Sequence, residues 1–180
     1  MLGKYPKLFV TGLFLAACST ASSKDKPHVL PEVERQLSAV YPNERRLEVN
    51  DLSEDAKKSF LEMAKGKEPG VICGPHGRSL PGCAVLLVNK GKNPVSTRVI
   101  YFWKDGAKLS SEQIEDFRKD KVQRDNVFLI AHPKANIENR GDGPDKILMS
   151  NDGVQRIIEG QSSMVFYFED GKVKKIWTAD

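Results

Sequence analysis

The stretch from 70 to 88 constrains the fold most, because two cysteines in it stand on either side of a segment that has to turn. Cys73 and Cys83 bracket "GPHGRSLPG", Gly74 to Gly82, whose glycines and prolines favour tight turning over any regular element. The runs "GVIC" before this segment and "CAVLLV" after it predict strands. The sequence therefore predicts two strands joined by a constrained loop, with the cysteines at the base of that loop.

The first 17 residues have the three parts of an export signal. Lys4 and Lys7 make the start positive, "LFVTGLFLAA" (8–17) is an apolar core of ten residues, and small residues lead to Cys18. A helix that crosses a bilayer needs about 20 apolar residues, so this core is too short to span. We predict that residues 1–17 are cleaved and that no transmembrane helix remains after processing.

The end of this signal, Leu15-Ala16-Ala17-Cys18, resembles the lipobox of bacterial lipoproteins, Leu-(Ala/Ser)-(Gly/Ala)-Cys. The resemblance covers the first 18 residues and implies that the Cys18 thiol receives a diacylglyceryl group and that the new amino terminus is acylated. Each buried methylene of an acyl chain contributes about 0.8 kcal/mol, and stable anchoring needs more than one chain. Membrane lipid is therefore an expected partner. The alternative is an ordinary signal peptide with a chance cysteine near its cleavage site.

Residues 18–28 are polar and lack apolar periodicity, which predicts a tether between the membrane and a folded domain. Ser19 follows Cys18 at the position where, in some Gram-negative lipoproteins, an aspartate signals retention at the inner membrane. The resemblance therefore implies a lipid anchor in the cell envelope. It favours the outer membrane, with the protein facing the periplasm, and leaves the inner membrane as the alternative.

Residues 29–180 remain for the folded part, a length that suits a single domain with a sizeable core. The chain has 28 Lys and Arg against 24 Asp and Glu, and two of the basic residues, Lys4 and Lys7, lie in the signal. The other charges are interspersed along the chain, as on a soluble surface and unlike a phosphate-binding stripe. We therefore expect no nucleic acid partner.

With Cys18 committed to lipid, Cys73 and Cys83 form an even pair in an oxidising compartment, where disulfides persist. Closing a loop of about 11 residues should stabilise the fold by roughly 3 kcal/mol on the chain-entropy model. A zinc site that includes His76 is one alternative, but zinc needs three or four ligands and no further candidate is near. A redox dithiol is the other, although such motifs separate their cysteines by two residues. We predict a structural disulfide.

Helical apolar spacing predicts helices over 31–42, 51–67 and 110–122. Pro31 suits a first helical turn, Asp51 or Ser53 can cap the second helix, and Ser110 with Gln113 fits a capping box at the third. The side chains expected to face the core are Val33, Leu37, Val40, Tyr41, Ala56, Phe60, Met63, Ala64, Ile114 and Phe117.

The remaining segments predict strands, turns and one polar loop, at the following positions. Strands are predicted near 47–49, over 96–103, 127–132 and 147–150, and as a hairpin over 163–178; residues 134–146 are expected to form a surface loop, and 152–160 a turn with one or two helical turns. We predict an α+β fold: a mostly antiparallel sheet with two or three helices packed on one face. The aromatic residues of 101–103 and 166–168, and Trp177, are expected to pack in the core rather than form an open stacking platform.

The sequence contains no residue grouping typical of a catalytic centre. His28, His76 and His132 lie in predicted loops, and no Gly-x-Ser-x-Gly elbow occurs. We expect no catalytic residues, no metal and no cofactor. The 24 acidic residues nevertheless leave open a carboxylate pair, and with it an enzyme that acts on peptidoglycan or another envelope glycan.

His76 and Arg78 on the clasped loop are the best candidates for recognition. A pre-organised loop loses little entropy on binding, and an arginine can bind a carboxylate or phosphate with two hydrogen bonds. A plain turn with solvated side chains is the alternative. We predict a lipid-anchored, non-catalytic binding or accessory module whose partner is an envelope protein or peptidoglycan. An inhibitor that inserts the loop 74–82 into an envelope hydrolase is a further hypothesis.

The polar segment 139–145 contains Arg140-Gly141-Asp142, a tripeptide that serves as an integrin-binding signal in host matrix proteins. It also offers the side-chain oxygens of Asn139, Asp142 and Asp145. Calcium loops of the EF-hand type end in a glutamate that is missing here. A solvated turn is therefore favoured over adhesion or calcium binding.

Overall fold

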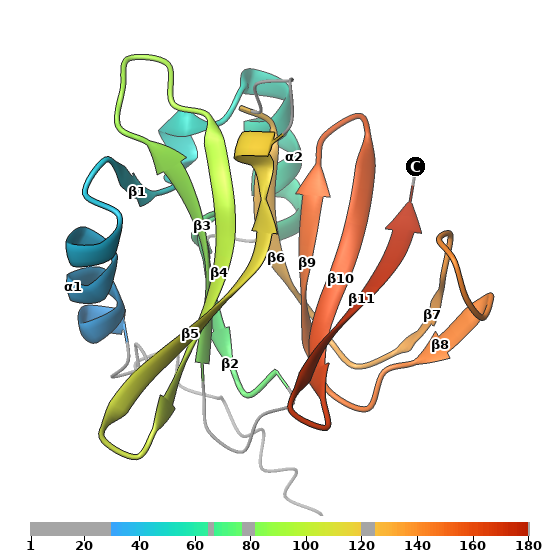
Figure 1. The fold of residues 1–180 in the computed structure, drawn as a ribbon. Helices are drawn as coiled ribbons and strands as arrows, with labels where there is room; N and C mark the ends of the chain where they lie inside the picture. Colours follow the sequence, from blue (N-terminus) through green and yellow to red (C-terminus); the bar gives the residue numbers. More distant parts are fainter. Residues whose placement is uncertain (1–29, 65–66, 77–81, 120–124, 180) are drawn as a thin grey trace, which may run out of the picture.

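The computed structural model describes residues 30–64, 67–76, 82–119 and 125–179, and antiparallel β-sheets dominate this part of the chain (Figure 1). The fold is roughly α+β, as predicted, but it contains two short α-helices and more strand than the sequence indicated. The helices are α1 (Leu30–Val40) and α2 (Glu54–Ala64). The strands are β1 (Glu44–Arg46), β2 (Val71–Gly74), β3 (Gly82–Asn89), β4 (Ser96–Asp105), β5 (Lys108–Asp116), β6 (Val127–His132), β7 (Asn136–Glu138), β8 (Lys146–Leu148), β9 (Gly153–Ile158), β10 (Ser162–Glu169) and β11 (Lys172–Ala179).

The strands form two main sheets and one small ribbon. The five-stranded sheet has the order β1-β3-β4-β5, and β2 pairs with the first half of β3, on the same edge as β1. The four-stranded sheet has the order β11-β10-β9-β6. β7 and β8 pair only with each other among the described strands, and we call this pair the ribbon.

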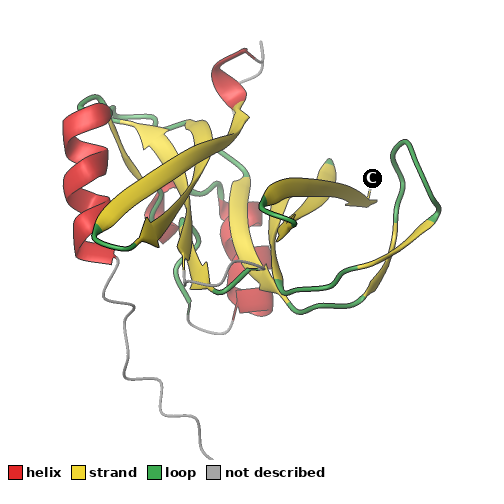
Figure 2. Ribbon diagram, turned by 60° about the horizontal axis from the view of Figure 1, so that its bottom comes forward, coloured by secondary structure: helices red, strands yellow, loops and turns green. Residues whose placement is uncertain are grey.

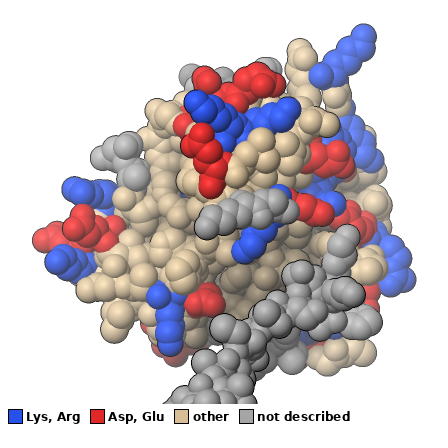
Figure 3. Space-filling model, turned by 180° about the vertical axis from the view of Figure 1, so that it is seen from behind, with Lys and Arg blue, Asp and Glu red and all other residues tan. Residues whose placement is uncertain are grey.

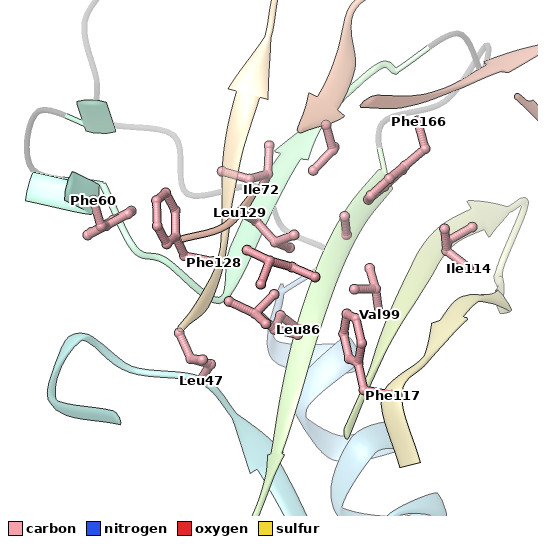
Figure 4. Close-up of a cluster of buried hydrophobic side chains, with 14 of the residues drawn as sticks. Leu47, Phe60, Ile72, Leu86, Val99, Ile114, Phe117, Phe128, Leu129 and Phe166 are labelled. Atoms are coloured by element: carbon pink, nitrogen blue, oxygen red, sulfur yellow. The ribbon is translucent and has the colours of Figure 1, made fainter. Parts of the chain in front are cut away.

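The two main sheets face each other across the largest hydrophobic cluster. β3, β4 and β10 are buried over most of their length, and successive side chains of a strand point to opposite faces of its sheet. On the inner face, Leu86 and Val99 of the five-stranded sheet lie in the same cluster as Leu129 and Phe166 of the four-stranded sheet (Figure 4). The aromatic and aliphatic residues of these strands are therefore core, as predicted.

Each main sheet is also covered on its outer face. Outside the five-stranded sheet, α1 packs Val33 and Leu37 in one cluster with Val85. Outside the four-stranded sheet, Ile137 of the ribbon packs in a cluster with Val165. Figure 2 shows α1 and the ribbon on opposite sides of the molecule, with the main sheets between them. The result is a sandwich with a separate cover on each side.

The two helices do not share one face of a sheet, so this part of the fold prediction is wrong. α2 places Ala56 and Phe60 in the inter-sheet cluster with Leu86, whereas α1 packs in the cluster that contains Leu87. Because Leu86 and Leu87 are consecutive residues of β3, their side chains point to opposite faces. The prediction failed because a helical stripe shows that a helix packs, but not against which face.

The helix boundaries largely agree with the prediction, but two core assignments do not. Val40 and Met63 are exposed, although both were expected to face the core. The buried residues of α2 are Ala56, Phe60 and Ala64, a stripe with a spacing of four that leaves Met63 to one side.

Within the described residues, no helix combines the length and the apolar character that crossing a bilayer requires.

The predicted third helix, 110–122, is wrong over the residues that the structure describes. Residues up to Asp116 belong to β5, Phe117–Lys119 form one 3-10 turn, and 120–122 lie outside the described residues. β5 pairs with β4 and contains a bulge opposite Val99 and Ile100, so that both Ile114 and Glu115 face the four-stranded sheet. The helix was predicted from Ile114 and Phe117, which are three residues apart; both are buried, but one lies at the bulge of β5 and the other in the 3-10 turn.

Two further segments contain more strand than predicted. The segment 152–160, expected to turn with some helix, forms β9, which pairs with both β6 and β10. The expected loop 134–146 contains β7 and the first residue of β8. The hairpin over 163–178 is confirmed, with Asp170 and Gly171 both at positive φ in its turn. In β9, cross-strand hydrogen bonds on both edges outweigh weak local preferences.

The chain before β2 connects the two sheets at one edge. The amide of Leu129 in β6 donates to Pro69 O (2.8 Å), and the amide of Leu86 in β3 donates to Gly70 O (2.9 Å). A Cβ on Gly70 would lie 2.2 Å from Leu47 O, so this close passage requires glycine. The carbonyls of Pro69 and Gly70 thus accept hydrogen bonds from β6 of one sheet and β3 of the other.

A buried ion pair connects the sheets through the core. Arg156 of β9 is 1% exposed and donates through Nε and Nη2 to the carboxylate of Glu115 in β5, at 3.1 and 3.0 Å. Its Nη1 donates to Ser162 Oγ (3.2 Å), and the guanidinium lies 5.3 Å from the centroid of the Trp177 ring. The bulge in β5 is what turns Glu115 toward this arginine.

Replacing Glu115 by alanine should leave Arg156 as an unpaired buried charge and lower the free energy of unfolding by about 3–5 kcal/mol in urea titrations. The double variant Glu115→Leu/Arg156→Met removes both charges and should recover most of that loss. As a control, Arg140→Ala breaks the exposed pair with Glu138, whose side chains are 59% and 65% exposed, and should cost less than about 1 kcal/mol. If Glu115→Ala and Arg140→Ala lower the free energy of unfolding by the same amount, the buried pair does not stabilise the fold more than the exposed pair does.

Candidate functional site

The predicted disulfide is present and closes the loop 74–82 at its base. Cys73 of β2 and Cys83 of β3 are directly opposite each other in the antiparallel ladder, with a Cα–Cα distance of 4.0 Å. Gly74 and Gly82 form the next pair, after which the chain leaves the sheet. A Cβ on Gly82 would lie 2.4 Å from Phe102 O, so the return of the loop requires glycine. The two predicted strands are confirmed, and residues 77–81 of the predicted loop lie outside the described residues.

The side chain of His76 lies on the opposite face of the five-stranded sheet from the two sulfur atoms. The cysteines belong to the cluster beneath α1, together with Phe102. The His76 ring instead packs edge-on against Tyr101, at 5.8 Å between centroids, and Tyr101 belongs to the inter-sheet cluster. Neighbouring residues of β4 point to opposite faces, so the sheet separates His76 from the sulfurs. This arrangement argues against the zinc alternative.

His76 holds the start of the loop and does not offer its ring to solvent. The residue is 4% exposed and has φ 38°, a left-handed conformation that is uncommon for residues other than glycine. Its carbonyl accepts a hydrogen bond from the Phe168 amide of β10 (3.0 Å). Burial lowers the pKa of His76, although the Ile72 carbonyl and Asp152 act in the opposite direction.

A direct contact between a partner and the His76 ring is therefore not supported, and a recognition role of this loop depends on its other residues. Arg78, the second candidate, lies outside the described residues, as do Cys18 and His28. His132, the remaining histidine, is half-buried at the end of β6, and its Nδ1 lies 2.7 Å from Pro133 O.

The structure also contains a polar hollow of about 520 Å³ at the start of α2, which the sequence did not reveal. It is held by hydrogen bonds from Ser53 N to Asp125 O (2.9 Å) and from Asn126 Nδ2 to Glu159 O (2.8 Å). A smaller hollow of about 370 Å³ shares Ser53 and Asp125 and extends to the segment 92–95. The only local signal was the run of acids in the first turn of α2, because the hollow is assembled from distant segments.

Four carboxylates and one lysine line the larger hollow: Asp55, Glu62, Asp125, Glu159 and Lys58. A glycan-cleaving general acid needs a carboxyl group whose pKa is raised. Two carboxyl groups elsewhere are shifted the other way. Hydrogen bonds from Arg118 hold the pKa of Asp116 far below its usual range. At Asp51, burial raises the pKa, but hydrogen bonds from Arg45 and the Glu48 amide outweigh it and lower the pKa.

The loop 139–145 is organised around Asn139 and Trp177. The side-chain Nδ2 of Asn139 donates to Asp142 O and Pro144 O (3.1 Å each). The backbone amide of Arg140 donates to Trp177 O (2.8 Å). A Cβ on Gly141 would lie 2.7 Å from the indole ring. The Asn139 side chain thus serves the loop itself. In the described residues, no group of three or more His, Cys, Asp or Glu side chains is arranged to hold a metal ion.

The surface shows no large area of one charge in the view opposite to Figure 1, where acidic and basic side chains lie beside one another (Figure 3). The prediction that Trp177 packs in the core is wrong: its side chain is 43% exposed, and Arg156 lies under its ring. The aromatic residues of β4 and β10 pack in the three hydrophobic clusters or against them.

Comparison with known proteins gave no relative: no family model, no curated protein and no solved structure matches this chain.

Removing the disulfide with the double variant Cys73→Ala/Cys83→Ala should lower the free energy of unfolding by about 3 kcal/mol, because the unfolded chain regains the entropy of the closed loop. Urea titration of the oxidised protein, with and without a reducing agent, measures the same difference in the wild type. The variant should be indifferent to the reducing agent. A wild type whose unfolding midpoint does not change on reduction would contradict a stabilising role.

Proposed function

We propose that the protein is a lipid-anchored component of the cell envelope that acts by binding, without catalysis, through the loop 74–82. The lipobox-like Leu15–Cys18, the short apolar core before it and the polar residues 18–28 support the anchor. The observation that carries the binding role is that the loop is held at its base by the disulfide and at His76 by the bond from Phe168. A loop fixed in this way loses little conformational entropy when it binds.

The position of α1 relates the loop to the anchor. Glu32, in the first turn of α1, accepts from Lys104 Nζ near the end of β4 (2.7 Å), and β4 ends where β2 ends and β3 begins. Figure 1 shows the start of α1 at the same end of the molecule as the β4–β5 turn. Residues 18–29 span at most about 40 Å when fully extended. This favours a partner close to the membrane: an envelope protein, a hydrolase that the loop inhibits, or peptidoglycan.

Blocking the lipoprotein signal peptidase with globomycin should cause an unprocessed precursor to accumulate, because cleavage before Cys18 requires that enzyme. Cys18→Ala should also prevent acylation and release mature-size protein from the membrane fraction, or leave only precursor. Thr20→Ala, two residues further on, should mature and sediment like the wild type. Normal maturation under globomycin, or a free thiol at Cys18 in mass spectrometry of native material, would contradict the anchor.

Ser19→Asp offers a test of the membrane proposed. If the lipoprotein sorting rule applies, this variant should move from the outer-membrane fraction to the inner-membrane fraction of a sucrose gradient. If both the wild type and the variant are found in the inner-membrane fraction, the proposed outer-membrane location is wrong.

A photocrosslinking residue in place of Arg78 should capture a partner in intact cells, whereas the same residue in place of Ala107, in the β4–β5 turn, should not. Arg78→Ala should reduce binding of the captured partner roughly tenfold or more, the effect of losing a charge-assisted hydrogen bond. The free energy of unfolding of this variant should stay within about 0.5 kcal/mol of the wild-type value if Arg78 acts in binding and not in the fold. Equal capture from both positions would contradict a specific role of the loop.

A further inference from the structure

His76 combines features that a simple loop residue does not need. Its imidazole is buried, and neither ring nitrogen has a hydrogen-bond partner of good geometry among the described residues. The ring lies over Gly74, where a Cβ would come within 3.1 Å of it, and against the edge of Tyr101. A buried polar ring without partners is unfavourable, and the cost rises steeply when the ring carries a charge.

The backbone of the same residue connects two parts of the fold. The His76 carbonyl accepts the Phe168 amide of β10, and Cys73, three residues earlier, is joined to β3 by the disulfide. The left-handed φ of His76 turns the chain so that the ring faces inward while the carbonyl reaches the four-stranded sheet. The ring and the hydrogen bond therefore depend on one conformation of one residue.

We propose that His76 is an acid-sensitive latch between the disulfide-clasped hairpin and the four-stranded sheet. When the ring takes up a proton from solvent, the imidazolium leaves its buried position, and the bond from Phe168 N–H to His76 O breaks. The disulfide keeps β2 and β3 together, so the change is local. The latch does not require the proposed binding function, since it concerns only how the loop is held.

The groups around the ring determine the direction of the effect. In the described chain, the titratable groups near it are Tyr101 of β4 and Asp152 in the turn before β9, whereas Ile72 and Gly74 of β2 and Phe168 of β10 have no ionisable side chain. Burial lowers the pKa of His76 and outweighs the opposing effects of the Ile72 carbonyl and of the Asp152 charge. The latch is therefore fully closed above the ordinary histidine pKa of about 6.5 and weakens as the pH falls below it.

Amide hydrogen exchange followed by NMR on the full-length mature protein tests the latch. Between pH 7.5 and pH 5.5, the protection factor of the Phe168 amide, corrected for intrinsic exchange, should fall by up to about tenfold. The Leu129 amide is the matched control within the same molecule, because it makes a comparable bond to Pro69 O without a histidine. Its protection should change less than twofold.

Two variants separate titration of the ring from general acid sensitivity. His76→Phe keeps a ring that cannot titrate and should hold the Phe168 protection constant over this pH range. Asp152→Asn removes the carboxylate that favours the charged ring in its buried position and should therefore increase the loss of protection between pH 7.5 and pH 5.5. Constant Phe168 protection in the wild type, or an equal loss at Phe168 and Leu129, would overturn the proposal, and neither outcome requires the variants to fold.

Discussion

The structure depends on one constraint: its central strands are apolar on both faces, so both faces must be covered. β3 is buried along almost its whole length, and β4 and β10 along most of theirs. One sheet packed on another covers only the inner faces. α1 covers the outer face of the five-stranded sheet and the ribbon covers that of the four-stranded sheet. In the described part of the chain, the helices, the two main sheets and the ribbon thereby form three hydrophobic clusters.

Polar contacts connect the two sheets in addition to the apolar layer. Arg156 and Glu115 cross between β9 and β5, and the bulge in β5 is the local irregularity that makes this pair geometrically available. Two backbone bonds, from Leu129 to Pro69 and from Phe168 to His76, connect the segments on either side of β2 to the four-stranded sheet. Such bonds add modest free energy, but they fix the relative position of the sheets.

The same arrangement bears on function. Since the aromatic strands are occupied in packing, the loops and hollows at the ends of the sandwich are the places where this protein can meet a partner. The base of the loop 74–82 is held by the disulfide and by His76, and it lies at the same end of the molecule as the start of α1. The proposed binding role close to a membrane rests on these two features together with the lipobox-like N-terminus.

Local patterns were reliable where the structure is local. The apolar run 83–88, the cysteine spacing and the turn at Asp170-Gly171 each predicted what the fold contains. The segment 110–122 misled because Ile114 and Phe117 have a helical spacing of three, and only the pairing of β5 with β4 shows that this segment is a strand. For the candidate site, the sequence predicted the disulfide and the two strands that it joins. It did not predict that His76 is buried, because that burial arises from contacts with β4 and β10.

The sequence by itself determined the strands with continuous or alternating apolar character, the clasped hairpin and the signal-like N-terminus, because each depends on residues that are neighbours in the chain. Only the tertiary structure decided which face each helix covers, which acids share a hollow, and that His76 is an internal anchor. These outcomes depend on contacts between residues far apart in sequence, such as His76 with Phe168 and Glu115 with Arg156. The spacing of apolar residues along the chain does not specify which distant surface an element will pack against, because that depends on how all the layers pack together.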